Sequence, residues 1–171
     1  MRPLFAFGTV IVLASVFACY DPPSEHYVPP VCPPLDQFKA SADGPEVSFR
    51  KDVLPNITLG CDVDTCHGSK GSGNLKLSNP DTVGLEKAAT TIYGNLVNKA
   101  ADAHKTMKRV VPGDPNNSFL MHKLDGDQCA LDATTCNHDD CGVSMPQDGD
   151  LLPDTDRAVI RKWIMQGAKD N

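Results

Sequence analysis

The stretch that most constrains this chain is Cys61-Asp-Val-Asp-Thr-Cys66-His67, which Gly68 follows directly. Two cysteines with a histidine right after the second are typical of covalent haem attachment, in which the thiols add to vinyl groups and the imidazole binds iron. The usual spacing is Cys-x-x-Cys-His, whereas four residues separate the cysteines here. We expect Cys61, Cys66 and His67 to hold one haem c, with the extra residues bulging out of the turn.

The N-terminus predicts export. Arg2 precedes an almost wholly apolar run over residues 4–17, which ends in the small Ala18 directly before Cys19. This run is shorter than the ~20 residues of a membrane-spanning helix, so we interpret residues 1–18 as a signal peptide. The ending is similar to that of bacterial lipoprotein signals. We therefore expect Cys19 to be lipidated in an exported cell-envelope protein, periplasmic or anchored to the outer membrane; an ordinary cleaved signal is the alternative.

Seven cysteines can be assigned in two ways. If a lipid takes Cys19 and haem takes two thiols, four cysteines remain, enough for two disulfides in an oxidising compartment. The cysteine count is equally consistent with three disulfides and no haem, so it does not decide between the two assignments. The candidate disulfide cysteines are Cys32, Cys129, Cys136 and Cys141.

We divide the exported chain into a lipid-anchored linker, residues 19–45, and one domain, residues 46–171. The stretch from Tyr20 to Pro45 contains seven of the 14 prolines, a density that favours an extended spacer. Cys32 is expected to tie this spacer to the domain. The length of 171 residues suits one domain. The net charge of −6 argues against a nucleic-acid partner.

Helical periodicity predicts a small all-α domain. Ser48 is the expected N-cap of a first helix, kinked or stopped early by Pro55, that ends just before Cys61. Further helices are expected over Asp81–Leu96, after Asn117 or Ser118, and from Asp154 to about Gly167.

Charged residues are unevenly spread along the chain. Lys99, Lys105, Lys108 and Arg109 form a basic patch that we interpret as a solvated face. Nine aspartates and no Lys or Arg lie between Asp125 and Asp156. Because unpaired carboxylates are rarely buried, we expect this segment to be mostly surface loop held by disulfides.

Met145 is the expected second axial ligand. An iron bound by His67 takes a thioether or imidazole from a distant loop on its other side, and Met145-Pro146 lies in a loop stiffened by proline. His138 is the strongest competitor. The other available side chains are Met107, Met121, Met165, His104 and His122; of these, Met121 and Met165 are expected in the core and His122 on the surface.

A set of short motifs occurs in a fixed order over residues 47–168. They are Val47-Ser-Phe49, Asp52–Pro55, Cys66-His67-Gly68, Gly73–Leu77, Val111–Pro115, Ser118–Leu120, Lys123-Leu124, Met145-Pro146, Ile160–Ile164 and Gly167-Ala168. Together they resemble the short class I cytochrome c-like domains of secreted bacterial proteins, the planctomycete-type cytochrome c group. The resemblance implies N- and C-terminal helices that cross beside a haem bound by Cys61, Cys66 and His67 and capped by Met145.

We therefore expect a membrane-anchored electron-transfer or redox-sensing module and not an enzyme, since no serine elbow, metalloprotease helix or phosphate loop is found. Its redox partner would present Lys and Arg to the acidic rim around Met145. One alternative is a haem-free, disulfide-stapled lipoprotein that acts as a binding or structural module. Another is a zinc site that joins Cys61, Cys66 and His67 to one of Cys129, Cys136, His138 or Cys141.

Overall fold

The computed structural model describes residues 31–171 except 36, 138–140 and 148. Within these ranges the chain has helices and no strand, which confirms the all-α prediction. The signal peptide, Cys19 and His138 lie outside the described residues. The longer elements are the π-helix η1 (Phe49–Val53), α1 (Leu54–Thr58), α2 (Pro80–Val83), α3 (Leu85–Leu96), α4 (Phe119–Asp125) and α5 (Asp154–Met165). Short 3-10 turns are η2 (Ser72–Asn74), η3 (Pro115–Asn117), η4 (Gln128–Ala130) and η5 (Ala133–Thr135).

The first helical segment begins as predicted and ends early. The Ser48 side chain accepts a hydrogen bond from the Lys51 amide, which confirms the N-cap. The π-helix gives way to α1 next to Pro55, because proline has no N–H to donate and is tolerated only at the start of an α-helix. Helix α1 then ends at Thr58, and residues 59 and 60 form a turn. The Thr58 hydroxyl donates to the Leu54 carbonyl at 2.9 Å.

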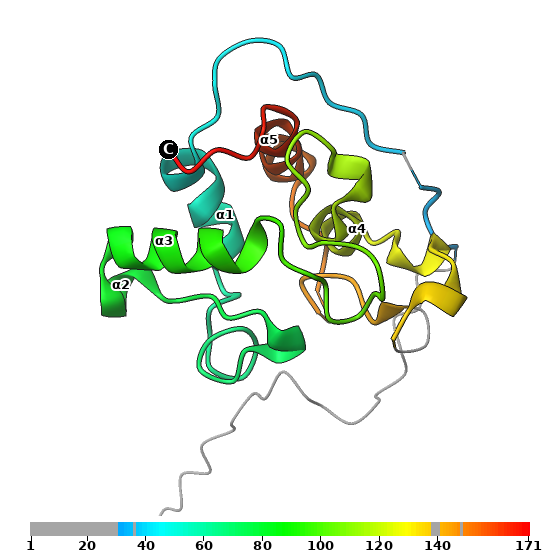
Figure 1. Cartoon of the computed structure of the whole chain (residues 1–171), viewed down its shortest axis with the longest axis horizontal. Helices are drawn as coiled ribbons and strands as arrows, with labels where there is room; N and C mark the ends of the chain where they lie inside the picture. Colours follow the sequence, from blue (N-terminus) through cyan, green and yellow to red (C-terminus); the bar gives the residue numbers. More distant parts are fainter. Residues whose placement is uncertain (1–30, 36, 138–140, 148) are drawn as a thin grey trace, which may run out of the picture.

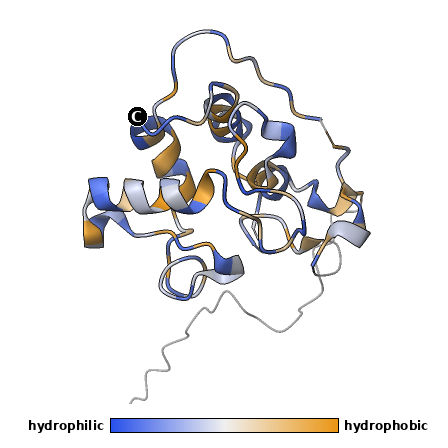
Figure 2. Ribbon diagram, in the orientation of Figure 1, coloured by the Kyte–Doolittle hydropathy of each residue, from blue (hydrophilic) through white to orange (hydrophobic). Residues whose placement is uncertain are grey.

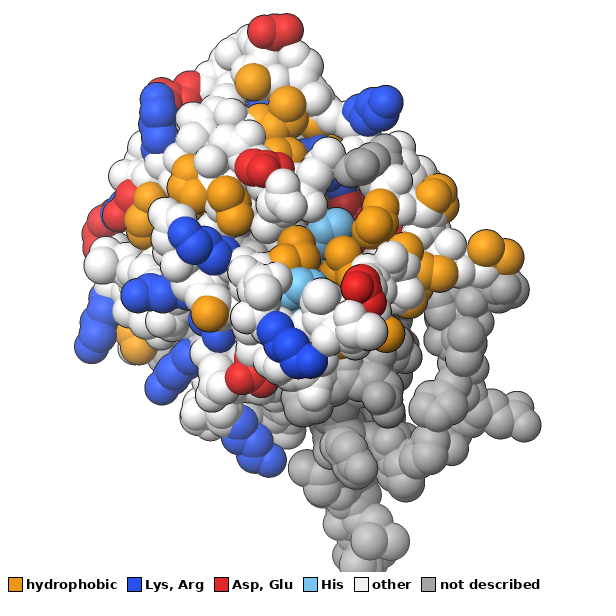
Figure 3. Space-filling view, turned by 45° about the vertical axis from the view of Figure 1, so that its right-hand side comes forward, with side chains coloured by type: hydrophobic (Ala, Val, Ile, Leu, Met, Phe, Trp, Pro, Cys, Tyr) orange, Lys and Arg blue, Asp and Glu red, His pale blue; other side chains and the backbone are white. Residues whose placement is uncertain are grey.

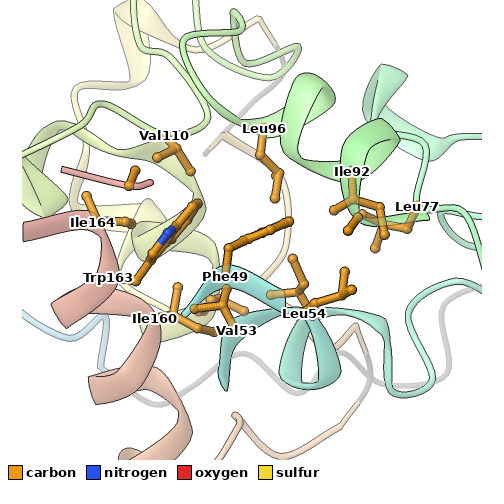
Figure 4. Packing of buried hydrophobic residues seen from close by; sticks show 14 of the residues in the cluster. Phe49, Val53, Leu54, Leu77, Ile92, Leu96, Val110, Ile160, Trp163 and Ile164 are labelled. Carbon is orange, nitrogen blue, oxygen red and sulfur yellow. The ribbon is translucent and has the colours of Figure 1, made fainter. Parts of the chain in front are cut away.

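The core joins η1 and α1 to α3 and α5. Phe49 lies between Trp163 and Tyr93, with ring centroids 5.1 Å and 5.5 Å away, and Figure 4 shows these helices contributing side chains to one cluster. The Trp163 indole donates to the Lys169 carbonyl at 2.8 Å, so its polar atom is satisfied. In Figure 1 the C-terminus lies beside the first helical turns, where the Ser48 hydroxyl donates to the Asn171 carbonyl at 2.8 Å.

The single helix predicted over Asp81–Leu96 is two helices. Gly84 has φ +85°, a conformation that glycine adopts without the strain of a side chain, and the break falls there. Helix α2 has its own cap, since the Asn79 side chain accepts from the Asp81 amide at 2.8 Å. Helix α3 buries Ile92 and Leu96 in the core. The apolar periodicity continued through Gly84 and therefore hid the break.

The acidic segment is only partly a surface loop. Asp125 and Asp127 are 2% and 3% exposed, because each meets a cationic partner. Two guanidiniums of α5, from Arg157 and Arg161, bind the Asp125 carboxylate. His122 binds Asp127 and is 5% exposed, so the prediction of a surface histidine was wrong. The cationic partners, His122, Arg157 and Arg161, lie just outside the acidic segment. The composition of the segment alone therefore did not show that these two carboxylates are buried.

Disulfide bonds are confirmed. Cys32 pairs with Cys129 and Cys136 with Cys141, so all four candidate cysteines are used. The first bond ties residues of the proline-rich stretch to the loop after α4. Structural disulfides indicate an oxidising, extracytoplasmic compartment. None of the helices in the described part of the chain is long and apolar enough to cross a membrane.

The loop between α3 and α4 is held by isolated bridges, which pair Val97 with Val110 and Ala100 with Lys108. Lys99, Lys105 and Lys108 on this loop are exposed, as the sequence predicted. On the face shown in Figure 3, Lys and Arg side chains gather toward one side. Figure 2 shows hydrophobic residues of α1 and α4 toward the middle of the molecule. Both helices contribute residues to the wall of a cavity.

Candidate functional site

An apolar cavity of about 360 Å³ brings together three of the four residues predicted to bind the cofactor: Cys61, His67 and Met145. Its size lies within the range of roughly 300–1,000 Å³ that is usual for ligand pockets. Most of the wall is hydrophobic and comes from segments far apart in sequence, including Leu75, Leu77, Leu96, Ala101, Phe119, Leu120, Leu124, Val143, Pro146 and Leu152.

The turn from Cys61 to Gly68 absorbs the long spacing. The Val63 carbonyl accepts the amides of Cys66 and Gly68 at 3.0 and 2.9 Å, and the His67 amide donates to the Cys61 carbonyl at 3.2 Å. Residues 63–65 are exposed, so the extra residues bulge into solvent. As a result Cys61 and His67 meet on the cavity wall although six positions separate them.

Gly68 is required by this turn. A Cβ built on it would lie 2.5 Å from the Asp62 carbonyl oxygen and 2.8 Å from the carbonyl carbon of Val63. These are backbone atoms, which cannot move aside as a flexible side chain can. The glycine after the histidine therefore allows the bulge to pack directly on the chain that carries the imidazole.

The His67 ring is oriented by backbone. Its Nδ1 lies 3.1 Å from the Leu75 carbonyl oxygen, which can only accept, so Nδ1 carries the proton. In the tautomer with its proton on Nδ1, the ring carries its electron pair on Nε2. Metal-binding histidines typically donate their other N–H to a carbonyl or carboxylate in this way. The Leu77 amide donates to the His67 carbonyl at 2.6 Å and fixes the same two segments together.

The other described histidines have no ring nitrogen to offer. His104 accepts the amides of Thr106 and Met107 at Nδ1, and its Nε2 lies 2.9 Å from the Thr135 hydroxyl. His122 has Asp127 at Nδ1 and the Asn116 carbonyl at Nε2. Both rings are buried and absent from the cavity wall.

Met145 is the only methionine of the described residues on the cavity wall. Its amide donates to the Lys123 carbonyl at 2.7 Å, which fastens its loop to α4. Met121 is 1% exposed in the main core, as predicted. Met107 packs against a second cluster, around Phe119. Among the described side chains, the cavity therefore meets one histidine and one methionine.

The two cysteines of the motif differ. Cys61 is a free thiol on the cavity wall, and burial raises its pKa, with Asp62 raising it further. Cys66 does not line the cavity, and its sulfur takes part in a disulfide. The structure therefore places Cys61 and His67, but not Cys66, at the predicted site.

The thiols proposed for a zinc site are otherwise engaged. Cys129, Cys136 and Cys141 form disulfides, and disulfide sulfur is a poor metal ligand compared with thiolate. In the part of the chain that the structure describes, no three His, Cys, Asp or Glu side chains are grouped so as to hold a metal ion.

Arg109 is a wall residue that the sequence analysis missed. Its guanidinium donates to the carbonyls of Asn95 and Gly73 at 2.7 and 3.1 Å. It forms no ion pair with a described carboxylate, and burial lowers its pKa, with Asp102 partly opposing this. A cation beside an apolar cavity suits a ligand that carries an acidic group. No sequence pattern separates Arg109 from the exposed lysines beside it.

Comparisons with known proteins add no relative: no protein-family model, curated protein or solved structure matches this chain.

Proposed function

We propose that the cavity binds one haem c and that the protein is a monohaem, c-type cytochrome-like module for electron transfer or redox sensing. The observation that carries this proposal is the pairing on one apolar wall of Met145 with a histidine whose Nδ1 is bonded to a backbone carbonyl. His67 would bind the iron through Nε2, and Met145 would bind it through sulfur. This ligand pair is one of those used by cytochromes c.

The chain also supplies attachment, burial and charge. Cys61 provides a thiol at the wall for a thioether bond; a second thioether at Cys66 would first require reduction of its disulfide. Arg109 would face the acidic substituents of the haem. The apolar side chains of the cavity wall would limit the access of water to the iron ligands. When bound, the haem supplies an iron that gains and loses one electron, and the Met145 thioether favours the ferrous form.

The proposed setting is a cell-envelope lipoprotein anchored through a lipid on Cys19, in the form of the chain whose Cys66 disulfide is reduced. Among the described residues, the loop with Met145 leads to the exposed side chains of Asp150 and Asp154. A redox partner with Lys and Arg at its docking surface would complement this rim. Because Met145 would bind the iron together with His67, the proposed role is electron exchange rather than catalysis at an open iron.

The supporting likeness to class I cytochrome c domains rests on motif order and on packing. The first helical segment meets the last helix through Phe49 and Trp163, at 5.1 Å between ring centroids. The first of these segments contributes Ile57 of α1 to the cavity wall. The contact between the two helices supports the proposal, since the resemblance implies that they cross.

The test is to export the protein in a host with a haem-attachment system and to record its visible spectrum and intact mass. We expect a mass increase of one haem and sharp alpha and beta bands after reduction with dithionite. A colourless protein with the mass of the polypeptide would overturn the proposal. The apolar cavity would then belong to a haem-free binding module, the alternative function.

A further inference from the structure

A second buried polar site lies on the other side of α4. The Nδ1 of His122 is 2.8 Å from Asp127 Oδ1, and its Nε2 is 2.9 Å from the Asn116 carbonyl oxygen. Neither oxygen has a proton to give, since one is a carboxylate and the other a backbone carbonyl. Both ring nitrogens must therefore donate, and only the protonated imidazolium does so. With 5% and 3% of their surfaces exposed, His122 and Asp127 form a buried ion pair.

Other charged groups lie around this pair. Asp125 also faces the cluster, but its carboxylate is bound by Arg157 and Arg161 from α5. Phe38, from the segment before η1, covers these guanidiniums, with its ring centroid 4.2 Å from Arg157. Burial lowers the pKa of His104, and the positive charge of His122 lowers it further. Burial lowers the pKa of His122, but the hydrogen bond and charge of Asp127, the bond to the Asn116 carbonyl and the charge of Asp125 together outweigh it, so the net shift is upward.

The ring of His122 bridges the two ends of its own helix. Asn116 lies in η3, just before α4, and Asp127 follows Gly126, where α4 ends with φ +72°. The opposite side of α4 lines the haem cavity with Leu120 and Leu124. The same helix holds the methionine loop, since the Lys123 carbonyl accepts the Met145 amide at 2.7 Å. A shift of α4 would therefore move the wall and the Met145 loop together.

We propose that protonated His122 is a positioning residue that clamps α4 and thereby holds Met145 at the cavity. A neutral imidazole has one N–H, so loss of the proton leaves either Asp127 or Asn116 facing a lone pair and frees one end of α4. The clamp is complete below the ordinary pKa of histidine, because the folded-state value is raised. It is lost as pH rises through the folded-state value. Only its effect on iron ligation rests on the proposed function.

The test follows two nuclei in the full exported domain by NMR: the ring nitrogens of His122 and the Met145 amide. We expect a doubly protonated ring at neutral pH that titrates above the ordinary histidine value. The protection of the Met145 amide from hydrogen exchange should fall by about tenfold or more over the same pH range, since a bond to a charged group is lost. Asp127→Asn should shift this fall to lower pH, whereas the exposed Asp150→Asn should leave it unchanged.

Two results would overturn the clamp: a neutral His122 ring at and below neutral pH, or Met145 protection that does not follow the titration of His122. Both readouts exist with or without haem, so a colourless protein refutes the proposed function and still tests the clamp. In a haem-loaded protein, the far-red absorption band of the sulfur–iron bond should weaken with the same midpoint. The wild type and Asp127→Asn are enough to test the clamp, so the test stands even if His122→Gln does not fold.

Discussion

His67 and His122 are both held by hydrogen bonds, but their surroundings assign them opposite roles. His67 is half-buried, has one ring nitrogen on the Leu75 carbonyl and turns toward an apolar cavity. His122 is buried, with oxygen acceptors on both ring nitrogens and a carboxylate as one of them. In the roles we propose, one ring keeps an electron pair for a metal, and the other keeps a positive charge for the fold. The number of acceptors around each ring therefore separates ligand from structural residue.

The largest expected effect is the loss of haem when His67 is replaced. In His67→Ala the iron loses its proximal ligand, so haem content per polypeptide should fall to near zero, measured by visible absorbance and intact mass of the exported protein. His122→Gln is the matched change, and it should keep haem wherever the protein is folded. Equal haem loss in both variants would show that the two rings are not distinguished as we describe.

A large loss of stability is expected when Asp125, in the buried charged cluster near His122, is replaced. Asp125→Ala removes the carboxylate that binds the buried Arg161 and leaves Arg157 only the exposed Asp154, and removing one partner of a buried pair costs about 3–5 kcal/mol. Chemical denaturation monitored by Trp163 fluorescence measures this. Asp64→Ala, at an exposed carboxylate of the His67 turn, should have a far smaller effect. A near-neutral Asp125→Ala would mean that the cluster contributes nothing to the folded state.

The substitution Gly68→Ala tests the turn that carries His67. The added Cβ would collide with the Asp62 carbonyl at 2.5 Å, and such overpacking costs about 1–3 kcal/mol. Because the clash lies next to His67, the ring should also lose its alignment with Leu75, which would appear as a lowered reduction potential or loss of haem. Unchanged stability and spectrum would show that the bulge moves freely away from this glycine.

The smallest expected effect is that of Gly94→Ala, which is the control for Gly68→Ala. Gly94 lies inside α3, and a Cβ on it would meet nothing within 4 Å. Gly94→Ala should therefore raise the free energy of unfolding by about 0.5–1 kcal/mol, through helix propensity alone. The same denaturation series measures it. A loss of stability here would mean that α3 has a neighbour in solution that the structure does not show.

Local patterns predicted the elements of this fold better than its breaks. Ser48 was identified as a cap and Asp154 as the start of the last helix, because both signals are local. The break at Gly84 was missed, since apolar periodicity runs on through it. Asp125 and Asp127 were placed at the surface because their partners are remote in sequence or, for His122, were themselves placed at the surface.

The candidate site was predicted in the same uneven way. Cys61, His67 and Met145 follow from motif spacing and meet on one wall. The direction of Cys66 depends on how the turn folds, which the spacing does not specify. Arg109 became a wall residue only because the carbonyls of Gly73 and Asn95 hold its side chain inward. Such contacts between distant segments have no local pattern.

The central claim is that His67 and Met145 face one haem, and proton NMR of the reduced protein tests it most directly. A methionine bound to ferrous haem places its methyl group within the ring current, so we expect a three-proton resonance shifted far upfield. Met145→Leu should abolish this resonance. Met121→Leu, a volume-conserving change in the core, should keep it. A haem-loaded protein that lacks the resonance, or keeps it without Met145, would contradict the account.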